Sequence, residues 1–261
     1  MMPKTNFSVL GPMEVVHAGR ACTPSAPKVR QVLALLLVSA NRLVLVDSII
    51  RELWDDNPPK SALTTTQTYI YQIRNLIQRE RLSGSGRELL LTKPFGYTLL
   101  VDQDQLDQDR FDHLVTRAEG FARAGQHEAA AADLRQALGL WQGPPLANVT
   151  QGPLLRSHVV HLAERRTHAL ELRIEADMHL GRHRELIGEL RSLIAENPLH
   201  EWLHAQLITV LSQAGRRGEA LAAFQGLREV LDRELGLDPS PAVQRLHREV
   251  LRGGRVLAIP A

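Results

Sequence analysis

The sequence has a single cysteine, Cys22, and aromatic residues make up only 4% of the chain. One cysteine permits neither an internal disulfide nor a cysteine metal cluster, which fits a reducing cytoplasm. The most apolar run, Val32–Val38, is too short to span a bilayer, and no apolar signal region follows the first residues. The phosphate-binding pattern G-x-x-x-x-G-K-[ST] is also absent. We therefore expect a cytoplasmic protein without a membrane segment, and no constellation of residues indicates an enzyme.

The charge is nearly balanced, because the formal net charge is only +2, but it is unevenly distributed. Residues 1–100 carry 12 basic and 7 acidic side chains, whereas residues 101–261 carry 19 basic and 22 acidic ones. A basic first part and a mildly acidic second part favour a polyanionic partner for the first part only. With 261 residues, 44% of them hydrophobic, the chain is long enough for two globular domains.

The segment Lys60–Arg81 has the clearest helical pattern. Its apolar positions recur at steps of three and four, at Leu63, Thr66, Ile70, Ile73 and Ile77. The opposite face is polar and consists of Thr64, Gln67, Thr68, Tyr71, Arg74, Asn75 and Gln78. Glu80 is the only acid in the segment, so this face suits a DNA groove, where short polar side chains reach base edges and arginine reaches guanine or phosphate. An ordinary solvated helix face is the alternative that the helix alone leaves open.

The neighbouring segments place this helix in a recognisable order. Short strand-like segments come first, at Phe7–Leu10, Glu14–His17 and Arg20–Thr23. Pro27 marks the start of a helix, and Asp47 is the expected N-cap of a second helix that ends at Trp54. A flexible link is expected at Ser83–Gly86, followed by two strands around Lys93–Gly96. Sheet, three helices and hairpin in this order are the layout of a winged helix-turn-helix.

From Asp102 onward the pattern predicts helix after helix, with a long one over residues 154–180. Similar small-Gly turns occur at Gly125, Gly181 and Gly215, the last two being 34 residues apart, which is the tetratricopeptide period. The predicted domains are therefore 1–101 and 102–261. The predicted fold is mainly α with a small β component, in which a winged helix precedes an all-α, tetratricopeptide-like domain.

The segments FSVLGPMEV, VLVDSIIRELWDDNPPKSA, TYIYQIRNLI and LLLTKPFGYTL resemble the OmpR-type winged helix, in the version found in Streptomyces antibiotic regulatory proteins. The segments ALGLWQGPPLANV and LDRELGLDPSPAVQRLHREVL resemble the bacterial transcriptional activation domain of the same family. The chain is thus similar to a short, stand-alone member. The resemblance implies a transcriptional activator of an antibiotic gene cluster, which binds direct repeats in promoter DNA as a homodimer and recruits RNA polymerase.

The candidate DNA contacts come from the helix face and from the wing. They are Thr64, Thr65, Gln67, Thr68, Tyr71, Gln72, Arg74, Asn75, Arg79, Arg81, Thr92 and Lys93. Where the family has Ser–Arg, this chain has Tyr71–Gln72, so the target sequence is expected to differ. The exposed candidates for docking to polymerase are Leu146–Leu155 and Arg216–Arg217.

No cofactor, catalytic residue or metal site is expected. The pairs His158/His161 and His179/His183 lack a carboxylate or cysteine at a known metal-ligand spacing. Two alternatives remain open, namely a tetratricopeptide-like scaffold for protein interactions and a ligand-responsive regulator. Steep salt dependence of binding to promoter DNA would distinguish the regulator from the scaffold.

Overall fold

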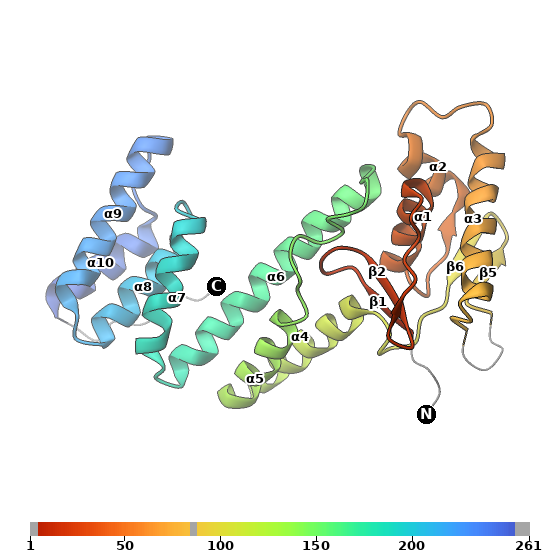
Figure 1. The fold of residues 1–261 in the computed structure, drawn as a ribbon. Coiled ribbons are helices and arrows are strands. Elements are labelled where there is room, and N and C mark those ends of the chain that lie inside the picture. The colour runs from red at the N-terminus through yellow and green to blue at the C-terminus, as the bar shows by residue number, and fades with distance from the viewer. Residues whose placement is uncertain (1–4, 84–87, 254–261) are drawn as a thin grey trace. The chain divides into compact units, whose positions relative to one another are not determined.

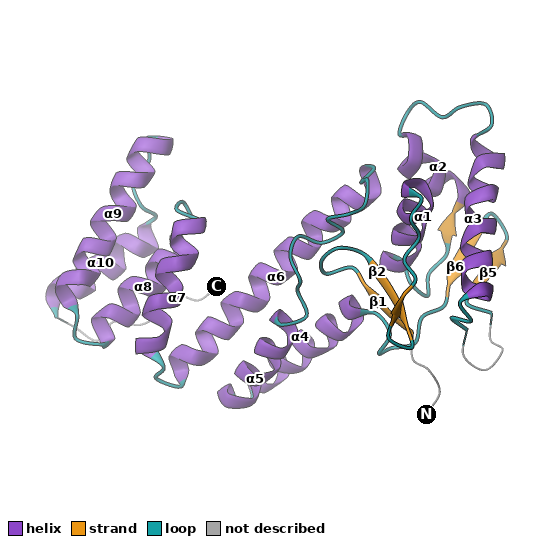
Figure 2. Ribbon diagram, in the orientation of Figure 1, coloured by secondary structure: helices purple, strands orange, loops and turns teal. Residues whose placement is uncertain are grey.

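A computed structural model describes residues 5–83 and 88–253, and most of the predicted link at Ser83–Gly86 lies outside the described residues. The first elements are β1 (Thr5–Ser8), β2 (Glu14–His17), β3 (Arg20–Ala21), α1 (Pro27–Val38), β4 (Val44–Leu45), α2 (Val46–Trp54), α3 (Ala62–Arg79), β5 (Leu90–Lys93) and β6 (Gly96–Leu99) (Figure 1). Helices follow: α4 (Asp107–Arg123), α5 (His127–Leu138), α6 (Pro153–His179), α7 (His183–Glu196), α8 (Glu201–Gln213), α9 (Arg217–Leu235) and α10 (Pro241–Arg252) (Figure 2). The predicted fold class is confirmed.

The chain forms two compact units. The first comprises residues 1–117 and 133–169, and the second comprises residues 118–132 and 170–261. The first unit therefore contains more than the winged helix, because it also includes parts of α4, α5 and α6.

The N-terminal sheet has the order β1-β2-β3 and is antiparallel, with Phe7 opposite Val15. The turn at Ala18–Gly19, between β2 and β3, has positive φ at both residues, as a tight hairpin turn requires. The third strand is shorter than predicted and contains only Arg20 and Ala21.

The second sheet has the order β4-β6-β5, and its strand β4 is an addition to the predicted pattern. Helix α2 follows β4 directly and begins at Val46, with Leu45 as its N-cap. The prediction of Asp47 as the N-cap is therefore wrong. The Val46 N–H donates to Phe95 O of the hairpin, which connects the start of α2 to the wing. At Gly96, an added Cβ would lie 2.2 Å from Val44 O. The pairing of β4 with the wing hairpin therefore requires glycine at this position.

The buried stripe of α3 departs from the predicted one at Leu63, whereas Thr66, Ile70 and Ile73 are buried as predicted and Ile77 is half-buried. Ala62, Thr66, Ile70, Ile73 and Leu76 are buried, whereas Leu63 is 52% exposed. Positions 62, 66, 70 and 73 follow the helical period, and Leu63 lies at the edge of this stripe. The stripe packs against α1 and α2, which directs the polar face outward.

The N-terminus of α6 is held by a side chain of α2. The Glu52 carboxylate accepts hydrogen bonds from Gly152 N (2.6 Å), Leu154 N (2.9 Å) and Leu155 N (3.1 Å). Gln31 Nε2 donates to the same carboxylate at 3.0 Å. Glu52 is only 2% exposed, so its charge is stabilised by these donors and by the N-terminal dipole of α6 rather than by water.

A second carboxylate connects α4 to the N-terminal sheet. Asp107 accepts hydrogen bonds from Val9 N (2.9 and 3.0 Å) and from Leu10 N (3.0 Å) in the segment after β1. Burial raises the pKa of Asp107 to about 6, even though its backbone N–H donors lower the pKa. The side chain is therefore ionised at neutral pH and able to accept from both backbone groups.

The loop between α5 and α6 lies along the same segment. Gln142 N donates to Leu10 O at 2.9 Å, and Leu146 N donates to Val9 O at 3.2 Å. Leu146 and Leu155 are both 0% exposed. The prediction that this loop is an exposed docking surface is therefore wrong for Leu146, Val149 and Leu155, which are buried within the first unit.

In the second unit, three helix turns repeat one geometry. Gly125, Gly181 and Gly215 have φ values of +72°, +74° and +76°, which favour glycine. After each glycine, the next backbone N–H donates to the carbonyl five residues earlier, as in Arg182 N to Asp177 O (3.1 Å). These turns join successive antiparallel helices, and α7–α10 enclose an apolar core with the end of α6.

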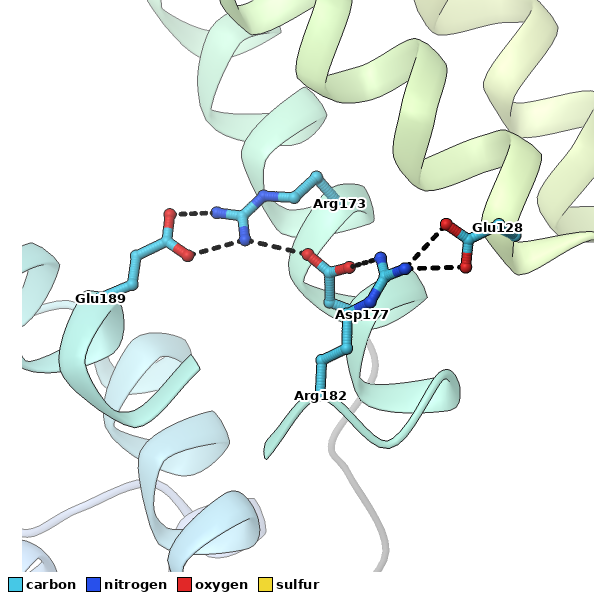
Figure 3. Close-up of polar contacts among 5 residues, drawn as sticks. All are labelled: Glu128, Arg173, Asp177, Arg182 and Glu189. Carbon is cyan, nitrogen blue, oxygen red and sulfur yellow. Dashed lines mark hydrogen bonds and ion pairs between the residues drawn. The ribbon is translucent and has the colours of Figure 1, made fainter. Parts of the chain in front are cut away.

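A chain of ion pairs also crosses the second unit (Figure 3). Arg182 contacts Glu128 of α5 (2.7 Å) and Asp177 of α6 (2.8 Å). Arg173 contacts Asp177 (3.2 Å) and Glu189 of α7. Arg173 and Asp177 are only 7% and 4% exposed, and each has two partners of opposite charge, which compensate for the burial of its charge.

We predict that Glu52→Gln lowers the free energy of unfolding by about 2–4 kcal/mol in urea denaturation. Each carboxylate oxygen of Glu52 accepts from at least two N–H groups, so either orientation of the new amide places its NH₂ against donors. Glu14→Gln, at an exposed position of β2, is the control and should change the value by less than about 0.5 kcal/mol. Equal stability of the two variants would contradict the role of Glu52.

A second prediction concerns pH. Because the pKa of Asp107 rises from 3.8 to about 6 on folding, its contribution to stability is fully present below about pH 4 and is lost as the pH rises through 6. The unfolding free energy of the wild type minus that of Asp107→Asn should therefore fall by up to about 3 kcal/mol between pH 4 and 7. Other carboxylates cancel in this difference, so a flat difference would refute the prediction.

Candidate nucleic-acid interface

Helix α3 presents most of the predicted contacts to solvent. The exposed ones on α3 are Thr64, Gln67, Thr68, Tyr71, Gln72, Asn75 and Arg79. Tyr71 is 63% exposed although it is large and aromatic. Thr65 and Arg74 are half-buried, since they lie at the two edges of the buried stripe. The structure thus gathers the predicted helix residues on one accessible, polar surface.

The electrostatics of α3 favour an anionic partner. No acidic residue occurs within Ala62–Arg79, and Arg79 lies in the last turn. Arg79 Nε contacts Glu80 Oε1 at 2.8 Å, but the Arg79 side chain is 73% exposed, so solvent screens this pair and a competing anion displaces it readily. Arg81 is exposed and lies beyond the helix end with a φ of 51°.

Arg74 connects α3 to the wing. Its Nη2 donates to Thr92 Oγ1 at 2.6 Å and to Leu90 O at 3.4 Å. Its guanidinium carbon lies 5.9 Å from the centre of the Tyr97 ring. Two predicted site residues from different elements, Arg74 and Thr92, are therefore in direct contact, and Arg74 connects α3 to the wing.

The wing tip carries one large side chain that the sequence patterns did not single out. Lys93 pairs with Gly96 across the hairpin, and Phe95 in the turn is 85% exposed with a φ of 66°. Thr92 and Lys93 are both exposed. Phe95 was missed because its exposure depends on the folded hairpin, and no spacing in the sequence indicates it.

The histidine pairs are arranged differently from a metal site. His158 bonds to Gln108 at 2.9 Å, and burial lowers the pKa of His158 to about 4. His179 stacks on His127, with ring centres 4.1 Å apart. Across the described ranges, no three His, Cys, Asp or Glu side chains are placed to hold a metal ion. None of the helices in these ranges is long and apolar enough to cross a membrane.

Comparisons with known proteins relate this arrangement to transcriptional regulators. The chain is 41% identical over 249 residues to the regulatory protein DnrI of Streptomyces peucetius, covering 94% of this chain and 92% of DnrI. It is 32% identical to the regulatory protein AfsR of Streptomyces griseus over 98% of this chain, but spans only 25% of AfsR.

A solved structure agrees with the fold. Mycobacterium tuberculosis EmbR, in complex with a low-affinity phosphopeptide, matches with a TM-score of 0.90 and 32% identity, over 97% of this chain and 66% of that one.

The family assignment follows from these matches together. Residues 106–251 match the bacterial transcriptional activator domain. This domain follows a winged helix with an exposed, acid-free helix face, and the similarity to DnrI covers nearly the whole chain. The chain therefore belongs to the Streptomyces antibiotic regulatory protein family of transcriptional activators.

Proposed function

We propose that this protein binds double-stranded promoter DNA, with α3 in the major groove and the β5–β6 wing on the adjacent backbone. The exposed polar face of α3 carries the proposal, because it offers Gln67 and Tyr71 to base edges with no acid to repel phosphate. The hydrogen bond from Arg74 to Thr92 supports it, since it holds the wing beside this face.

The rest of the proposal concerns the roles of the two parts of the chain, the target genes and the assembly of the protein on DNA. Residues 1–101 supply the DNA-binding part and residues 102–261 the activating part, which recruits RNA polymerase in the cytoplasm. The target is a secondary-metabolite gene cluster, as the family relationship to DnrI supports. The protein acts as a homodimer on direct repeats, because two copies in the same orientation contact head to tail along the groove.

The tests use the full chain. A fragment ending at Val101 would leave Glu52 without its partners in α6, and Val9 N and Leu10 N without Asp107. Such a fragment would confound lost stability with lost binding.

We expect Arg74→Ala to weaken binding to the specific operator by about 1–3 kcal/mol, measured by fluorescence anisotropy. Lys93→Ala is the contrasting variant: if the exposed Lys93 contacts phosphate, we expect an equal loss for all DNA sequences and a salt slope smaller by about one. Arg123→Ala, on the exposed end of α4, is the matched control without effect. Unchanged operator affinity in a folded Arg74→Ala protein would remove α3 from this role.

The arrangement on DNA has its own test. If two copies bind direct repeats in the same orientation, reversing one half-site at constant spacing should abolish cooperative binding in a footprinting titration. A two-fold dimer would instead require inverted half-sites. Cooperativity that survives the reversal would therefore exclude the head-to-tail arrangement.

A further inference from the structure

A cavity of about 260 Å³ opens in the first unit between the segment after β6, α4 and α5. Its walls are formed by Gln103 and Asp104 from that segment, by Arg110, His113 and Arg117 from α4, and by Gln136 from α5. Its volume is just below the about 300–1,000 Å³ of sites for drug-sized ligands, so it suits a smaller metabolite.

One wall of the cavity is cationic because of helical spacing. Arg110, His113 and Arg117 are three and four residues apart and so share one face of α4. Arg117 is already neutralised: its Nε and Nη2 donate to the buried Asp133 carboxylate at 2.5 and 2.6 Å. Among the described residues, the side chains of Arg110 and His113 make no hydrogen bond and no ion pair, although the Asp107 carboxylate lies near enough to interact electrostatically with Arg110. Their side-chain donors are therefore available.

The facing wall carries the opposite charge. Asp104, from the segment after β6, has no hydrogen bond or ion pair within the described residues. Gln103 and Gln136 likewise have no side-chain partner there, and each amide offers both a donor and an acceptor. A complementary ligand therefore needs a carboxylate for Arg110 and, at its other end, a hydroxyl or amino donor for Asp104.

We propose that this cavity binds a small hydroxy- or amino-carboxylate. The carboxylate pairs with Arg110 and His113, and the donor group points to Asp104. Leu114, which is 6% exposed, supplies an apolar surface for the carbon skeleton.

The surroundings of the cavity connect it to the winged helix. Gln105, next to Asp104, accepts a hydrogen bond from Phe7 N of β1 at 2.7 Å. Asp107, one helical turn before Arg110, accepts from Leu10 N. A ligand that joins Asp104 to Arg110 would therefore stiffen the contact between α4 and the N-terminal sheet. This coupling rests on the proposed DNA-binding function, whereas ligand binding itself does not.

The binding test uses lactate and alanine as probes, with propionate as their matched control. The three molecules share a carbon skeleton and a carboxylate but differ at the second carbon. In NMR titrations of the full chain at pH 7 and constant ionic strength, lactate or alanine should saturate the site at least about tenfold more tightly than propionate. Asp104→Ala should remove this preference because alanine has no side-chain acceptor, and Arg110→Gln should weaken binding of every probe by about tenfold or more.

Control variants distinguish a lost site from a misfolded protein. Arg123→Gln, at the other end of α4, should leave all affinities unchanged. The variants at 104 and 110 should fold normally, because the side chains of Asp104 and Arg110 are exposed and make no hydrogen bond or ion pair among the described residues. Failure of every probe to saturate, or equal binding by Arg110→Gln, would overturn the site.

Operator affinity is then measured with and without the bound probe. A change in the wild type that Arg110→Gln lacks supports the coupling, and an unchanged affinity overturns it. If the protein did not bind operator DNA, the ligand titration would still show whether the cavity binds the probes. Failure of the DNA-binding proposal is therefore distinguishable from failure of the ligand site.

Discussion

The buried carboxylate of Glu52 is the contact on which the first unit depends, because it connects α2, on which α3 packs, to the start of α6. A charge that is 2% exposed is tolerated only when its lone pairs are occupied, and four N–H groups occupy these. The approach is so close that a Cβ on Gly152 would lie 2.0 Å from Glu52 O, so only glycine fits there. Gly152 lies 100 positions after Glu52 in the sequence, and its N–H donates to Glu52 of α2. Because α3 packs on α2, this long-range contact also supports α3.

Asp107 provides a second connection, on the side of the N-terminal sheet. The two carboxylates bind from opposite directions in sequence: Glu52 reaches forward to α6, and Asp107 reaches back to the segment after β1. Each of the two carboxylates accepts from backbone N–H groups that would otherwise lack a hydrogen-bond partner. The helical part therefore completes the fold of the winged helix in this chain, and a boundary drawn from sequence character at residue 101 does not coincide with the limits of a compact unit.

Local features were predictable from the sequence, and long-range ones were not. Pro27 at a helix start and the glycine turns depend on a few adjacent residues, and the structure has both. Glu52, in contrast, looks like any charged helix residue until its partners at α6 are known. The strand β4 has only two residues and depends on pairing with β6, so no periodicity indicated it. Of the candidate site, exposure of the α3 face was predictable, but the bond from Arg74 to the wing was not.

Arg74 connects α3 to the wing. Its guanidinium contacts Thr92 Oγ1, Leu90 O and the face of the Tyr97 ring, so this side chain already has partners within the protein. An exposed hydrogen bond of this kind contributes only about 1 kcal/mol, so a phosphate or guanine is able to replace it. Such an exchange would remove one contact between α3 and β5, while β6 stays paired with β4. If α3 binds DNA as proposed, contacts through Gln67 and Tyr71 would not involve the wing, whereas a contact through Arg74 would compete with its bond to Thr92.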